Sequence, residues 1–138
     1  MARKKTVRIP EAMQASMLEH ARKDFPYEAC GIISGDNAGE PVKFYPARNE
    51  YRSSTCYNVL PEDLLHIFED LEEQGHYLWG IFHSHPYSEA YPSATDLEQA
   101  YYPEAYHLIL SLLDYQNPVL RGFLLGEDGE VEEVEIEN

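Results

Sequence analysis

Cysteine is scarce in this 138-residue sequence, which contains only Cys30 and Cys56. Two cysteines are too few for the disulfide framework of a small secreted domain, so we expect a reducing, cytoplasmic environment. Long hydrophobic runs are also missing, and the basic amino terminus, MARKK, is not followed by an apolar stretch of signal-peptide length. These absences predict a protein with no targeting segment and no membrane span.

Basic residues are few as well. The chain has 10 lysines and arginines against 25 aspartates and glutamates, which gives a formal net charge of −15 at pH 7. Such a surface repels a phosphate backbone or an anionic membrane, so neither nucleic acid nor a membrane is an expected partner. The acidity is typical of a surface that keeps a protein soluble, and it also suits a basic protein partner or a salty cell interior.

The length and the pattern of hydrophobic residues predict one domain, residues 1–138, of mixed α and β structure. Alternating or continuous apolar runs predict strands, and apolar residues three or four positions apart predict helices. Segments 28–35 and 41–49 are expected to pair around GDNAGE. The expected strands cover residues 5–10, 28–35, 41–49, 76–85, 105–114, 118–126 and 130–137, and the expected helices cover residues 11–25, 61–75 and 93–102.

The segment HSHPYSEAYPSATD gathers polar residues that could carry chemistry. Alternate residues of a strand share a face, so His83 and His85 would present both imidazoles on one side. Pro86 makes the chain turn, which can bring Asp96 beside them as a third ligand. Two nitrogens and one carboxylate oxygen suit a catalytic zinc. Two alternatives stay open, because strands also carry histidines for packing, and Ser93-x-x-Asp96 is the spacing of a helix N-cap.

A metal hydrolase also needs a base that takes a proton from water and passes it to the leaving amine. Glu28 is the candidate, because it stands at the entrance of the apolar segment EACGIISG, where partial desolvation would raise the pKa of its carboxyl. The alternative is an ordinary solvated strand end. Cys30 would share the strand face of Glu28, but a single cysteine beside Gly31 is typical of apolar packing rather than of a ligand or nucleophile.

The residues HSH-PYSEAYP-SATD match the HxHx7SxxD signature of the JAMM, or MPN+, metalloprotease family, and PYEACG resembles the upstream glutamate segment of that family. The resemblance implies an MPN-like, cytidine-deaminase-like layered fold, in which helices flank a central mixed sheet. It also implies one zinc ion per chain, held by His83, His85 and Asp96. Glu28 would be the general acid and base, and the Ser93 hydroxyl would help to hold the oxyanion.

The same resemblance implies a substrate class. Family members with the intact motif cleave the amide or isopeptide bond after the C-terminal glycine of ubiquitin-like proteins, and the small prokaryotic members act on ubiquitin-like sulfur carriers or their conjugates. An extended Gly-Gly tail would pair with a sheet edge along a narrow path, for which segments 51–59 and 88–92 are candidates. Tyr87 and Tyr91 flank the metal loop and are candidates for contact with that tail. A homodimer is possible.

Two other functions remain alternatives. A non-catalytic MPN-like module could bind a ubiquitin-like partner without cutting it, although the intact ligand set argues against this. A cupin-type metal enzyme would use the same HxH followed by a glutamate, and Glu89 stands at a suitable offset. However, Asp96 occupies the position at which the cupin motif requires glycine, no second cupin motif follows, and the expected helices disagree with an all-β barrel.

Overall fold

A computed structural model of the chain describes residues 5–99 and 102–138. Every predicted strand and helix is present, but several are shorter than expected. The first strand covers only Thr6–Arg8, and the strand expected over residues 105–114 ends at Ser111. The helix expected over residues 93–102 is shorter, because it ends at Glu98 and Gln99 forms a turn, while residues 100 and 101 lie outside the described part. The elements are β1 (Thr6–Arg8), α1 (Glu11–Asp24), β2 (Cys30–Gly35), β3 (Pro41–Ala47), α2 (Pro61–Gln74), β4 (Tyr77–His85), α3 (Ala94–Glu98), β5 (Tyr106–Ser111), β6 (Val119–Leu125) and β7 (Val131–Glu137).

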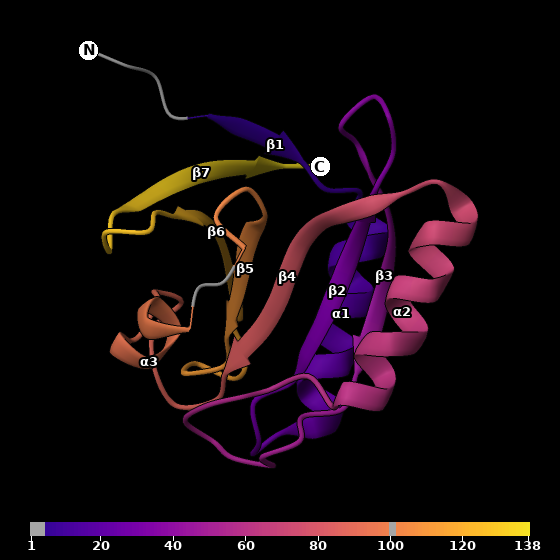
Figure 1. Cartoon of the computed structure of the whole chain (residues 1–138). Helices are drawn as coiled ribbons and strands as arrows, with labels where there is room; N and C mark the ends of the chain where they lie inside the picture. The colour runs from indigo at the N-terminus through magenta and orange to yellow at the C-terminus, as the bar shows by residue number, and fades with distance from the viewer. Residues whose placement is uncertain (1–4, 100–101) are drawn as a thin grey trace.

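The described strands form one mixed sheet in the order β1-β7-β6-β5-β4-β2-β3. The pairs β1–β7 and β4–β5 are parallel, and the other neighbours are antiparallel. Strands β2 and β3 form the expected antiparallel pair. Figure 1 shows the sheet curling from β1 and β7 towards β2 and β3, which lie between α1 and α2. This mixed sheet with flanking helices confirms the predicted fold class.

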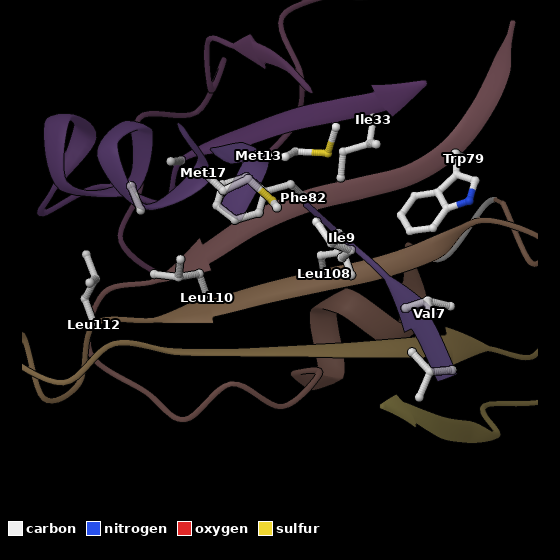
Figure 2. Close-up of a cluster of buried hydrophobic side chains, with 13 residues drawn as sticks. Val7, Ile9, Met13, Met17, Ile33, Trp79, Phe82, Leu108, Leu110 and Leu112 are labelled. Carbon is white, nitrogen blue, oxygen red and sulfur yellow. The ribbon is translucent and has the colours of Figure 1, made fainter. Parts of the chain in front are cut away.

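Helices α1 and α2 cover opposite faces of the sheet, because neighbouring residues of one strand pack in different clusters. On β4, Phe82 packs with Met13 and Met17 of α1, as Figure 2 shows, whereas Ile81 packs in a second cluster with Ile67 of α2. Residues at positions 83 and 85 therefore share the face of Ile81. The sequence periodicity thus places both histidines on the α2 face of the sheet.

The ends of α2 follow from its sequence. Pro61 occupies the first turn, where the missing N–H costs nothing, and Gly75 ends the helix in the left-handed conformation with a φ of 70°. Ile67 and Leu71 lie one turn apart and bury the apolar side. No helix in residues 5–99 and 102–138 is long and apolar enough to span a membrane.

Candidate metal and catalytic site

The structure brings together the three residues that the sequence predicts as ligands. The Nε2 atoms of His83 and His85 lie 3.1 Å apart, and each lies 3.1 Å from the Oδ2 atom of Asp96. Both histidines come from the end of β4, and Asp96 comes from the first turn of α3. The two imidazoles are almost fully buried. Three electron-pair donors thus converge at one point on the α2 face of the sheet.

Neighbouring groups fix the orientation of two of these side chains. The Nδ1–H of His85 donates to the backbone carbonyl of Glu89 at 2.7 Å, which leaves the lone pair of the neutral ring on Nε2. The ring of Tyr57 stacks on that of His83 with centroids 4.5 Å apart and an interplanar angle of 21°. These contacts hold the ring nitrogens in place before any ligand binds.

The arrangement fits a metal ion in its donor chemistry and in its spacing. Ligand atoms at about 2.0–2.1 Å from a tetrahedral zinc lie about 3.3 Å from one another, close to the 3.1 Å spacing in this structure. Burial alone would raise the pKa of Asp96, but His83, His85 and the backbone N–H of Ser93 hold it far below its usual value. Burial lowers the pKa of His83, despite the opposing effect of Asp96, so its ring favours the neutral, metal-binding form.

Glu28 lies beside this group. One of its carboxylate oxygens and a ring nitrogen of each histidine, His83 and His85, lie within 4.8 Å of one another, an arrangement that could itself hold a metal ion. The side chain is buried, and its Oε1 atom has no hydrogen-bond partner among the described residues. Burial raises the pKa of Glu28 to about 8, and the smaller effects of His85 and Asp96 oppose each other. The carboxyl can therefore exchange a proton near neutral pH.

Ser93 is the N-cap of α3. Its hydroxyl oxygen accepts the N–H of Asp96 at 3.0 Å, and its own N–H donates to Oδ2 of Asp96 at 2.9 Å. The structure thus confirms the N-cap interpretation of the Ser-x-x-Asp spacing. The cap also presents Asp96 to the histidines, so this bond pair supports the ligand arrangement. Because the cap uses the hydroxyl oxygen only as an acceptor, its O–H remains able to donate.

Sequence reasoning missed Asn49, which joins Glu28 to the segment after β3. Asn49 is buried, and its Nδ2 donates to the carbonyl oxygens of Glu28 and Cys56, both at 3.1 Å. Its Oδ1 accepts the backbone N–H groups of Tyr51 and Asn58 at 3.0 and 3.1 Å. All four hydrogen-bonding positions of the amide are used. The contact with Glu28, 21 positions away, is not visible in the local sequence around Asn49.

Three other residues considered in the sequence analysis are Tyr87, Tyr91 and Cys30. Tyr87 is exposed and packs edge-on against Phe25, and Tyr91 is exposed and packs against Phe123. Their contact with a substrate stays a prediction. Cys30 is buried in the cluster under α2, and burial raises the pKa of its thiol to about 12, as expected of a packing residue.

Comparison with known proteins supports the resemblance seen in the sequence. Residues 10–125 match the family of prokaryotic homologs of the JAB domain. The chain is 34% identical over 119 residues to the CysO-cysteine peptidase of Mycobacterium tuberculosis. The aligned region covers 86% of this chain and 82% of that protein. It is 38% identical over 102 residues to the desampylase of Haloferax volcanii. This aligned region covers 70% of this chain and 73% of that protein.

Solved structures agree. The solution structure of a protein from Desulfitobacterium hafniense superposes on this structure with a TM-score of 0.85 at 36% sequence identity. The superposed region covers 95% of this chain and 91% of that chain. A JAB1/MPN domain protein from Archaeoglobus fulgidus shares the fold, with a TM-score of 0.60 at 20% identity over 97% of this chain and 99% of its own. The chain therefore belongs to the family of prokaryotic homologs of the JAB domain and is a hydrolase of the JAMM type.

Proposed function

We propose that this protein is a zinc peptidase that hydrolyses the amide bond after the C-terminal Gly-Gly of a ubiquitin-like or sulfur-carrier protein. One observation carries the proposal: the buried carboxyl of Glu28, whose Oε1 has no hydrogen-bond partner among the described residues, lies beside the converging donor atoms of His83, His85 and Asp96. A binding module has no need for an unpaired buried carboxylate oxygen, whereas hydrolysis requires a positioned group that can take up and release a proton.

Each residue has a distinct part in the reaction. His83, His85 and Asp96 would hold one zinc ion, which supplies Lewis acidity and lowers the pKa of a bound water towards about 7. Glu28 takes a proton from the attacking water and gives it to the nitrogen of the leaving group. The O–H of Ser93 donates to the oxygen that gains negative charge. The C–N bond breaks, and the products are a carrier carboxylate and a free amine.

The substrate class rests on the relatives and on the fold. The relatives include a CysO-cysteine peptidase, a desampylase and a probable TtuB-protein conjugate cleaving protease. A ubiquitin-like or sulfur-carrier protein is therefore the substrate that we propose. Its flexible Gly-Gly tail would reach the buried ligands in an extended form, along residues 51–59 or 88–92.

The test compares cleavage by the parent protein and Glu28→Gln, both loaded with zinc, on a sulfur carrier whose Gly-Gly carboxyl is joined to an amine. Mass spectrometry reads out the released carrier. We expect Glu28→Gln to keep its zinc and to lose at least about a hundredfold in rate. Glu127→Gln makes the same change at an exposed site and is expected to cleave at the parent rate. Equal cleavage by Glu28→Gln would overturn the mechanism, and the absence of cleavage by any protein would favour a binding module.

A further inference from the structure

A cavity of about 170 Å³ adjoins the candidate metal site, and His83 and Asp96 form part of its wall. The remaining wall is largely apolar and includes Ile32, Val59, Leu64 and Ile81. The volume is several times the roughly 30 Å³ that one water occupies in the liquid. It is smaller than the roughly 300–1,000 Å³ of typical small-molecule sites. The space therefore suits one side chain.

Two buried nitrogen atoms belong to residues that line this cavity and have no hydrogen-bond partner within the described part of the chain: Nε2 of His107 and Nδ1 of His83. His107 is 5% exposed and His83 is 1% exposed. Leaving buried polar atoms unpaired costs free energy, so native proteins seldom do so without a reason. A ligand that supplies the missing partners would recover this cost.

The two nitrogen atoms are chemically complementary. The ring of His107 is hydrogen-bonded to the backbone of Tyr102, and because Nε2 is unpaired, Nδ1 makes that bond. Burial lowers the pKa of His107 to about 4, so the ring is neutral and Nε2 is an acceptor. When His83 holds the proposed zinc through Nε2, which faces His85 and Asp96, its Nδ1 would carry the hydrogen and act as a donor. A hydroxyl or a carboxamide can donate to an acceptor such as Nε2 of His107 and accept from a donor such as Nδ1 of His83.

The position of Glu28 indicates which part of the substrate lies here. Glu28 lines a separate cavity together with Asn49 and Arg52. A residue that protonates the leaving amine must lie on the side of that amine, so we assign the cavity of His107 to the acyl side of the scissile bond. Two extended residues span at most about 7 Å, so the side chain that precedes a Gly-Gly can reach a cavity adjoining the metal site.

We propose that this cavity is a subsite for the residue that precedes the Gly-Gly of the substrate, and that His107 determines its specificity for an uncharged side chain ending in a hydroxyl or carboxamide. The apolar wall disfavours a charged side chain, which would lose its hydration there. The inference rests on the proposed function, because it assigns the acyl side from the role of Glu28.

The test uses the zinc-loaded full chain and two peptides that end in Thr-Gly-Gly or Val-Gly-Gly, each joined to a fluorescent amine. Threonine and valine have nearly the same shape, and only threonine has the hydroxyl. We expect kcat/KM to be roughly tenfold or more higher for the threonine peptide. His107→Phe should bring this ratio close to one. His66→Phe makes the same change at an exposed position of α2 and should leave the ratio unchanged.

A second measurement does not depend on cleavage or on a variant. The free acid peptides ending in Thr-Gly-Gly and Val-Gly-Gly are added to zinc-loaded, ¹⁵N-labelled parent protein, and the ring nitrogens of His107 are followed by NMR. A shift with the threonine peptide alone supports the subsite. Cleavage of both peptides at equal rates overturns the subsite and leaves the peptidase proposal standing. If neither peptide is cleaved, the peptidase proposal fails on these substrates, and a missing His107 shift overturns the subsite as well.

Discussion

The backbone N–H of Asp96 donates to the Ser93 hydroxyl oxygen at 3.0 Å, while the Asp96 carboxylate accepts the Ser93 backbone N–H at 2.9 Å. This pair of bonds both caps α3 and presents Asp96 to the histidines. We expect Ser93→Ala to lower the free energy of unfolding by about 1 kcal/mol through loss of the cap. We also expect it to lower kcat by roughly a hundredfold, through loss of the oxyanion donor.

Urea unfolding and cleavage kinetics on the same zinc-loaded preparations separate the two effects. Ser93→Thr retains a hydroxyl and should keep most of the stability and the rate. A Ser93→Ala protein that is less stable but cleaves as fast as the parent would show that Ser93 is a cap alone.

Asn49 is expected to affect both stability and catalysis, because its amide bonds Glu28 to the segment that carries Tyr57. Asn49→Ala leaves buried backbone groups unpaired, at a cost of about 1–3 kcal/mol in the free energy of unfolding. Release of the Glu28 backbone should also lower kcat more than it raises KM. Asn117→Ala removes an exposed amide bond to Asp114 and should change stability by less than about 0.5 kcal/mol. Equal effects of the two variants would contradict the role of Asn49.

Glu28 should make the metal-free protein less stable as the pH rises through neutrality. The pKa of Glu28 is about 8 in the folded protein, against 4.5 for an ordinary glutamate, so the folded state binds more protons between these values. Its contribution to stability is present below pH 4.5 and is lost as the pH approaches 8. Glu28→Gln removes this contribution, and urea unfolding at pH 5 and pH 8 should show a smaller difference for the variant. An identical difference for parent and variant would exclude a buried, protonated Glu28.

The two cysteines should differ in reactivity. Burial raises the pKa of Cys30 to about 12, which suppresses the thiolate, whereas Cys56 is partly exposed. Iodoacetamide at pH 8 is expected to modify Cys56 alone in the folded protein and both cysteines in urea. Rapid modification of Cys30 in the folded state, located by peptide mass spectrometry, would contradict its place in the core.

The sequence allowed prediction of those parts of the site that depend on local geometry. His83 and His85 share a strand face because they are two residues apart, and Ser93 and Asp96 form a cap because they are three apart, so spacing alone indicates these relationships. The family resemblance then placed Glu28 with them. The structure supports this set of residues by bringing them together, whereas their individual roles stay predictions.

The parts of the site that the sequence did not predict depend on contacts between distant parts of the chain. Asn49 reaches the Glu28 carbonyl across 21 positions, and Tyr57 stacks on His83 across a longer stretch. The sequence alone does not distinguish His107 from an ordinary polar residue of a strand, because its burial depends on the packing of β5 beside β4. Helix α3 ends earlier than its apolar pattern predicts, and Pro103 disfavours helical backbone at the preceding residue.

The most direct test of the central claim is the zinc content per chain, measured by elemental mass spectrometry after loosely bound metal has been removed. The parent protein is expected to hold about one zinc per chain. His85→Ala should hold none, whereas His66→Ala, at an exposed position of α2, should hold as much as the parent. No zinc in the parent after reloading, or equal zinc in parent and His85→Ala, would contradict a metal site formed by His83, His85 and Asp96.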